Sequence, residues 1–404
     1  MATEQQKPEN TRMALDAKSK MHVLVRRVDA GAGAPGKAEL EDMNALLMAR
    51  NAGDIARAID GLGLMYASDG VPSKRKLGAA SLKKALGARF TSPGADRLIR
   101  ECYFDPFSKT GDAAWAFELV GHPGKAPTSR AATELDLLAD DGFIREGSAY
   151  VIEPLHDWLV LRNLMSISLR LLANSRTAAA EGTLGDILGA TGFRHIVPQS
   201  KAAKVALGGR AAYVIPVGYN PFFSRPQLDL TWNDEDIWPF YCSITGDKDL
   251  AEKVLGTNRP KHLIGSPDVR FITSVQADKT EASLSLKNKA DDPENTWLYL
   301  ALIADEDGQE AVANKFLRAM DAVFGTRSIE CGGERGAELR AASHPTNLPE
   351  AMWARAWDHQ GRYLMSCKHC GRVTFAYMLG GETTFCSPGC RSAYSKAHRG
   401  QAGE

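Results

Sequence analysis

The chain has 404 residues, of which 44% are hydrophobic and 24% charged, as in an ordinary globular protein. Lysine plus arginine equals aspartate plus glutamate at 49 each, so no global field draws the chain to nucleic acid or to an acidic membrane. Any nucleic-acid surface must therefore be local. The length suggests two or three domains.

The compartment follows from the terminus and the cysteines. Residues 1–20 are polar and lack the apolar core of a signal peptide, so we expect a disordered tail. The most apolar segment, residues 158–173, is interrupted by Arg162 and Arg170 and is too polar to span a bilayer. The cysteine number is odd, at 7, which argues against a disulfide framework. We expect a cytoplasmic protein with no membrane partner.

The N-terminal region, residues 21–128, is expected to be helical or mixed. The run HVLVRRV predicts a strand over 22–28. Apolar residues three or four apart predict helices over four segments, 39–51, 54–65, 80–90 and 94–102. Proline and glycine at 121–129 indicate a boundary.

The central region, residues 129–328, is expected to be α+β. A helix over 131–138, a turn at 146–148 and a short hairpin fit either the end of a winged helix or any α+β fold. The apolar pattern predicts a core helix over 158–172, packed on two sides. It also predicts strands over 211–217, 269–275 and 282–286, and a helix over 309–324. Residues 329–358 are expected to be a linker, glycine-rich to 349, leading into a last helix.

Four cysteines form the strongest motif of the chain. Cys367 and Cys370 are separated by two residues, and Cys386 and Cys390 by three, with fifteen residues between the pairs. This is the spacing of a four-thiolate zinc site, because short pairs on two turns bring four donors to one tetrahedral ion. A thioredoxin-like pair does not account for the second pair. A catalytic ion is disfavoured because such sites keep one position open.

The residues around the cysteines predict a zinc finger over 359–404. Gly371 permits the tight turn of a zinc knuckle, and Gly380-Gly381 a hairpin turn. Ser387 and Pro388 suit the start of a helix that ends near His398. Knuckle, hairpin and helix together are a treble-clef arrangement around one structural Zn²⁺. Metal binding would supply its folding free energy, about 10–16 kcal/mol in zinc-finger peptides.

The run RYLMSCKHCGRVTF…TTFCSPGCRSAYSKAHR resembles the C-terminal fingers of bacterial CGNR-type proteins. The shared features are an aromatic after the first pair, an aromatic-Cys-Ser entry to the second, and a basic final helix. The resemblance covers about forty residues and implies a transcriptional regulator with a variable N-terminal domain. Two features depart from the family: the first pair is closer, and Cys390 is followed by Arg-Ser-Ala in place of Gly-Asn-Arg.

A nucleic-acid surface on the finger would use five residues, Arg372, Arg391, Tyr394, Lys396 and Arg399. The cations could contact phosphates and the tyrosine could stack on a base. Residues 361–404 carry a formal charge of +4, which a tetrathiolate zinc centre reduces to about +2. A solvated helix end, a protein-binding role or a purely structural role remains equally open.

A nucleotide-binding alternative starts from residues 31–38, which match G-x4-G-K. Leu298–Ala304, followed by Asp305 and Glu306, imitates a Walker-B strand. Ala38 stands where the Mg²⁺-binding hydroxyl belongs, and the same Pro-Gly-Lys-Ala recurs at 123–126. We therefore expect a non-enzymatic, DNA-linked regulator, with a zinc-stapled protein-interaction module as the alternative and a P-loop-like NTPase third.

Overall fold

The structure is a computed structural model of the full chain. It describes residues 10–15, 22–28, 40–49, 52–63, 65, 77–86, 143–182, 184–198, 201–219, 268–273, 297–304, 308–325, 327–332, 338–343, 345, 348–369, 372–375, 385–386 and 388–398. The helices expected at 94–102 and 131–138, the strand at 282–286 and the boundary at 121–129 lie outside these residues.

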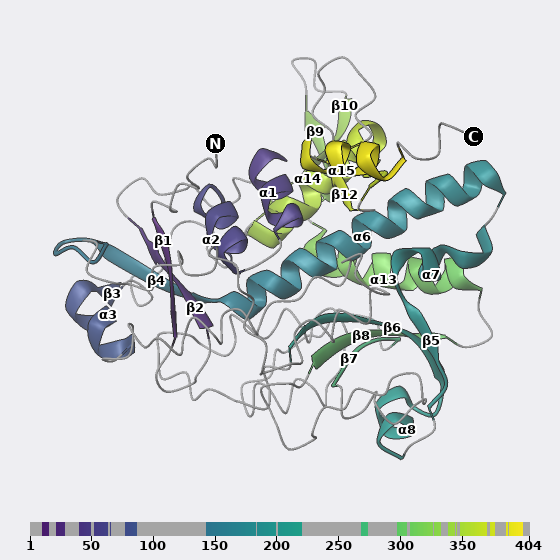
Figure 1. The fold of residues 1–404 in the computed structure, drawn as a ribbon, viewed down its shortest axis with the longest axis horizontal. Helices are drawn as coiled ribbons and strands as arrows, with labels where there is room; N and C mark the ends of the chain where they lie inside the picture. The colour runs from purple at the N-terminus through teal and green to yellow at the C-terminus, as the bar shows by residue number, and fades with distance from the viewer. Residues whose placement is uncertain are drawn as a thin grey trace.

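The first sheet is antiparallel throughout, with the strand order β1-β2-β4-β3. Its strands are β1 (Thr11–Leu15), β2 (His22–Arg27), β3 (Leu77–Gly78) and β4 (Ala149–Pro154), and α3 (Ala79–Leu86) follows β3. The sheet forms one end of the molecule (Figure 1). The consecutive Val23, Leu24 and Val25, two of them β-branched, account for β2, where the sequence predicted a strand.

The turn before β4 leads into this sheet and forms no hairpin of its own. Gly147 has φ 82°, a conformation that glycine adopts without steric cost. Tyr150 Oη donates to the carbonyl of Phe143 at 2.9 Å and closes the loop. Residues 143–148 contain no strand, and β4 pairs with β2 and β3 instead. The expectation of a short hairpin here was wrong, so this segment has no wing that could read DNA.

Helix α6 (Leu155–Glu181) continues directly from β4 through the centre of the molecule (Figure 1). Its 27 residues extend for about 40 Å. Every residue from 157 to 169 is buried, so the helix is enclosed on all sides and not on two. Its polar side chains are paired within the core: Asn163 Nδ2 donates to the Val217 carbonyl at 2.8 Å, and Ser168 Oγ to Leu164 at 2.8 Å.

Two helices of the N-terminal region, α1 (Leu40–Met48) and α2 (Ala52–Asp60), end against buried arginines. The last carbonyls of a helix have no partner within it and carry partial negative charge. Arg162, 1% exposed on α6, donates to the carbonyls of Leu47 at 3.2 Å and Ala49 at 3.0 Å. Arg26 of β2 closes α2 by donating to three carbonyls, those of Ile59 (2.7 Å), Leu62 (2.6 Å) and Gly63 (2.8 Å).

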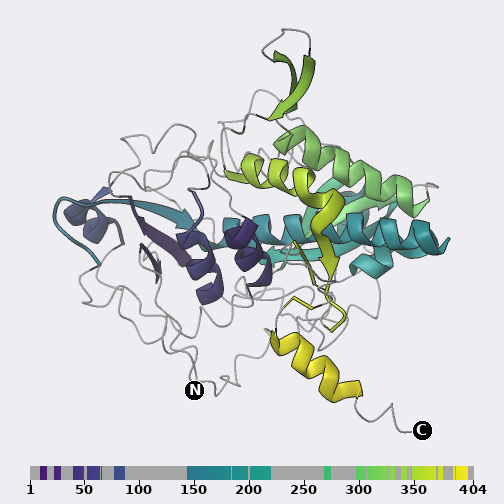
Figure 2. The same cartoon turned by 90° about the horizontal axis from the view of Figure 1, so that it is seen from above.

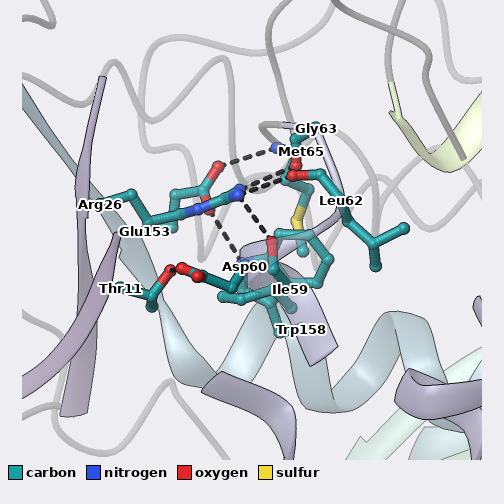
Figure 3. Close-up of polar contacts among 9 residues, drawn as sticks. All are labelled: Thr11, Arg26, Ile59, Asp60, Leu62, Gly63, Met65, Glu153 and Trp158. Carbon is teal, nitrogen blue, oxygen red and sulfur yellow. Dashed lines mark hydrogen bonds and ion pairs between the residues drawn. The ribbon is translucent and has the colours of Figure 1, made fainter. Parts of the chain in front are cut away.

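Glu153 of β4 balances the charge of Arg26 inside this region (Figure 3). Its carboxylate accepts hydrogen bonds from the Met65 amide at 2.8 Å and from Trp158 Nε1 at 3.1 Å. Arg26 Nη1 lies 3.4 Å from Oε2, and the two side chains are only 9% and 5% exposed. A buried ion pair is tolerated when its remaining donors and acceptors are also satisfied. This polar cluster joins β2, β4, α2 and the start of α6.

The second sheet is also antiparallel, with the order β5-β6-β8-β7. Its strands are β5 (Arg194–Ile196), β6 (Ala211–Tyr219), β7 (Val269–Thr273) and β8 (Trp297–Ala304). A 3-10 turn, η5 (Leu184–Asp186), and the short helix α7 (Ile187–Thr191) lie between α6 and β5, and α8 (Lys201–Leu207) lies between β5 and β6. Residues 299–304 of β8 are all buried, as its continuous apolar sequence predicts.

Helix α13 (Gln309–Phe324) lies against β8, and α6 against β6. The bounds of α13 are those that the apolar spacing predicted. Asp268, before β7, joins α13 to the sheet: Lys315 Nζ lies 3.2 Å from Oδ2 and Arg210 Nη2 2.9 Å from Oδ1. Burial opposes ionisation of this carboxyl, but the hydrogen bonds from Arg210 and Lys315 outweigh it and lower the pKa of Asp268 from the usual 3.8.

The segment expected to be a linker forms a β-hairpin. Strands β9 (Arg327–Gly332) and β10 (Glu338–Ser343) pair antiparallel and project from the body in both views (Figures 1 and 2). Helix α14 (Leu348–Tyr363) follows. The glycine and polar residues made this segment resemble a linker. Each strand has only six residues, so the strand pattern is short and easily missed in the sequence.

One apolar core joins the two four-stranded sheets to the helices between and after them. It extends from Leu24 to Phe375 and includes Leu46, Trp158 and Phe316, which come from α1, α6 and α13. The regions drawn from the sequence at 21–128 and 129–328 therefore share a core, and the proposed division at 358/359 falls inside α14. Helices combined with antiparallel sheets confirm the α+β class. Within the described residues, no helix has the length and apolar character needed to cross a membrane.

Candidate metal centre

The first part of the centre is a small hairpin after α14. Strands β11 (Leu364–Ser366) and β12 (Val373–Phe375) pair antiparallel, and Cys367 follows β11 directly. The Cys367 amide donates to the carbonyl of Arg372 at 2.9 Å, which closes the turn. Cys367 is 2% exposed. Cys370 and Gly371, on which the predicted knuckle depends, lie outside the described residues.

This hairpin is attached to the body by side chains far away in the sequence. Asn44 of α1 acts like a strand edge: its Oδ1 accepts from the Phe375 amide at 2.9 Å, and its Nδ2 donates to the Phe375 carbonyl at 2.7 Å. Arg372 Nη1 donates to the Met48 carbonyl at 2.7 Å and so joins Arg162 at the end of α1. Val373, Thr374 and Phe375 are 5%, 4% and 2% exposed. Strand β12 is thus part of the core, whereas β11 is half-buried or exposed.

The second part of the centre is α15 (Pro388–His398) and the residues before it. Proline suits the first helical position because its missing N–H would have no partner there and its φ already fits the helix. Cys390 is in the first turn, and among the described residues of α15 it alone is buried. Cys386, before the helix, is half-buried. Figure 2 shows α15 standing apart from α6 and α14.

The two parts bring three sulfurs together. The Sγ atoms of Cys367, Cys386 and Cys390 all lie within 4.8 Å of one another, and those of Cys386 and Cys390 are 3.5 Å apart. All three are reduced thiols. Zn–S bonds of about 2.3 Å in a tetrahedron place sulfurs about 3.8 Å apart. These three cysteines therefore fit a metal ion, and Cys370 lies outside the described residues.

The residues predicted to contact nucleic acid have different surroundings. Arg391 and Lys396 of α15 are exposed. Tyr394 is half-buried between Phe385, at a ring distance of 5.2 Å, and His398, which stacks on it at 3.9 Å. Tyr394 therefore already has two ring neighbours within the finger, and Arg399 lies outside the described residues.

Arg372 does not belong to this surface. It is 7% exposed and its guanidinium donates to the end of α1. Its assignment to a nucleic-acid surface was wrong, because burial of the guanidinium leaves no face for a phosphate. In sequence, Arg372 is a basic residue beside a cysteine pair, and only the position of α1 distinguishes a structural arginine from a ligand-binding one.

The strands of the nucleotide-binding alternative are not neighbours. The loop at 31–38 follows β2, and the acids at 305–306 follow β8, although the loop and the acids themselves lie outside the described residues. β2 and β8 belong to different sheets, and each pairs only antiparallel with its neighbours. A Walker pair needs both strands in one sheet to bring lysine and acids to the same phosphate and Mg²⁺. The topology speaks against that alternative.

Comparison of the chain with protein-family models, with curated proteins and with solved structures found no match.

Proposed function

We propose that Cys367, Cys370, Cys386 and Cys390 hold one structural Zn²⁺ in a treble-clef-like finger. The observation that carries this proposal is the convergence of three thiols from two separate segments. Soft thiolate donors in a tetrahedral set select zinc among the common divalent ions. Four thiolates leave no open position for substrate, so the centre is structural. Thiols survive in a reducing compartment, and we propose the cytoplasm.

The test of the centre measures zinc on the intact protein by native mass spectrometry. We expect one Zn²⁺ per chain, weaker zinc binding after Cys390→Ser, and unchanged binding after Cys331→Ser, a matched control in the β9–β10 hairpin. Removal of one thiolate from a four-ligand site weakens binding because the remaining donors no longer complete the tetrahedron. Equal zinc affinity in both variants would overturn the proposal.

We further propose that the centre fixes α15 so that its outer face contacts DNA, in a protein that regulates transcription. Successive residues of a helix are about 100° apart around its axis. This spacing puts Arg391 and Lys396 about 140° apart around the axis, each more than a quarter-turn from Cys390, and both cations are exposed. Exposed cations that flank the face opposite Cys390 can neutralise phosphates along a duplex. The resemblance to CGNR-type fingers, which also end in a basic helix, supports the same proposal.

DNA binding is tested by fluorescence anisotropy with a random-sequence duplex over a salt series. We expect Arg391→Glu with Lys396→Glu to weaken binding and to reduce the salt slope by up to about 2, since each lost phosphate contact removes about 0.9. Lys201→Glu with Lys204→Glu makes the same charge change on α8, where both lysines are exposed, and serves as the control.

Equal effects of the two double variants, or no binding by the zinc-loaded protein at low salt, would sink the DNA proposal. Those results would favour the alternative, in which the zinc centre is purely structural and α15 docks to a protein. The zinc measurement is independent of both outcomes.

A further inference from the structure

The two halves of the metal centre are attached to the molecule by very different means. The β11–β12 half needs no metal for its contacts: Asn44 makes two hydrogen bonds to Phe375, Arg372 reaches Met48, and β12 is buried in the core. Loss of a bound ion leaves every one of these contacts in place. This half of the centre is therefore formed in advance by the body.

The α15 half has no comparable support among the described residues. Only Cys390 is buried on the helix, and α15 stands apart from α6 and α14 (Figure 2). The helix has 11 residues, and an isolated helix of fewer than about 12–15 residues is marginal in water. The contacts of Tyr394 with Phe385 and His398 are local to the finger. Within the described residues, the sulfurs of Cys386 and Cys390 join α15 to Cys367 of the β11–β12 half.

We infer that the centre is a redox-sensitive clasp: in the metal-free chain a peroxide joins Cys386 and Cys390 in a disulfide, which keeps α15 detached while the β11–β12 hairpin remains on the body. The inference rests on the proposed zinc centre. It adds that the two halves separate, and that the cysteine pair on the α15 side is the one that oxidises.

The positions of the thiols select this pair. Cys386 is half-buried, whereas Cys367 and Cys390 are 2% and 4% exposed, so Cys386 is the most accessible of the three to a dissolved oxidant. Its sulfur lies 3.5 Å from that of Cys390, which is therefore in place as the resolving thiol. Cys367 is held on the opposite side by its backbone bond to Arg372.

The reaction uses one hydrogen peroxide for each disulfide. The Cys386 thiolate attacks one peroxide oxygen, the O–O bond breaks, and the products are a sulfenic acid and hydroxide, which is protonated to water. The Cys390 thiolate then attacks the Cys386 sulfur, the S–O bond breaks, and the leaving hydroxide also becomes water. Two thiols lose two electrons in total, and peroxide is reduced to two waters. A thiol reductant reverses the step.

The experiment follows hydrogen exchange by mass spectrometry on the full chain in three states: zinc-loaded, metal-free and reduced, and metal-free after hydrogen peroxide. We expect exchange of residues 388–398 to rise about tenfold or more in both metal-free states, and exchange of residues 364–375 to change less than about twofold. Peptide mapping should find the disulfide between Cys386 and Cys390. Zinc uptake, followed by native mass, should be lost after peroxide and restored by a thiol reductant.

Cys386→Ser and Cys331→Ser serve as the matched variants. The first should abolish the peroxide-dependent loss of zinc uptake, and the second should leave it unchanged. Loss of protection in residues 364–375 together with 388–398 would overturn the clasp, and so would a disulfide that includes Cys367. Failure of the zinc proposal is a separate result, because the untreated chain would then take up no zinc.

Discussion

The buried pair of Arg26 and Glu153 offers the sharpest test of the fold. Arg26→Met removes a guanidinium that donates to three carbonyls at the end of α2, while methionine keeps much of the side-chain volume. The Glu153 carboxylate, 5% exposed, is then left buried without its cation. Removing one partner of a buried ion pair destabilises a protein by about 3–5 kcal/mol, because the other charge stays uncompensated.

Urea unfolding followed by tryptophan fluorescence measures this loss. Arg57→Met is the matched control on the same region: Arg57 pairs with Asp54 one turn earlier in α2, with side chains 31% and 27% exposed. Such a surface pair contributes about 0.3–0.5 kcal/mol. Adding Glu153→Gln to Arg26→Met should recover part of the loss, because the buried charge disappears. A loss for Arg26→Met no larger than for Arg57→Met, or a double variant less stable than the sum of the single ones, would refute the reasoning.

Three further predictions concern other contacts. Asn44→Asp keeps the acceptor for the Phe375 amide but turns a donor toward the Phe375 carbonyl into an acceptor; we expect a loss of about 1–3 kcal/mol in unfolding free energy and faster hydrogen exchange in β12. An unchanged exchange rate would contradict this attachment. Arg162→Met should destabilise more than Arg57→Met, since it uncovers the Leu47 and Ala49 carbonyls in the core; equal urea midpoints would show that Arg162 is not a cap. Asp268→Asn tests linkage. The folded-state pKa of Asp268 is lowered, so its contribution is complete above 3.8 and is lost as pH falls below that value. The stability difference from the parent protein should therefore be constant near neutral pH and shrink below pH 3.8, and a difference that grows on acidification would reverse the sign.

The sequence pattern predicted the ends of α13 and the cluster of cysteines. The apolar spacing of α13 and the glycine at 325 gave both of its ends: a Cβ at Gly325 would lie 2.3 Å from the Asp321 carbonyl oxygen, so only glycine fits there. The cysteine spacing likewise predicted the cluster of Cys367, Cys386 and Cys390, because short pairs on turns determine where their thiols point. The end of α13 depends on neighbours within a few residues, and the cluster depends on the spacing within and between two short cysteine segments.

Contacts across the chain were not predictable in this way. In sequence, Arg162 only interrupts an apolar segment, and Arg372 resembles part of a basic finger, because the pattern of their own segments contains no trace of α1. The partner of Arg372 is Met48, 324 residues earlier. The β9–β10 hairpin was missed for a different reason, namely that its glycines and charges resemble those of a linker. Contacts with α1 decide the role of the two arginines. Pairing between β9 and β10, and not the propensity of either segment, decides the hairpin.

The bonds between Asn44 and Phe375 have a consequence for biosynthesis. They join residues 331 positions apart, so α1 leaves the ribosome long before the strand that completes it has been made. Until then the side of α1 that receives β12 is open, together with the Met48 carbonyl that Arg372 later covers. Contacts of such separation form slowly, and surfaces exposed during translation are open to aggregation and to chaperones. A nascent chain stalled before residue 372 should therefore be a chaperone client, although most of its core has already been synthesised.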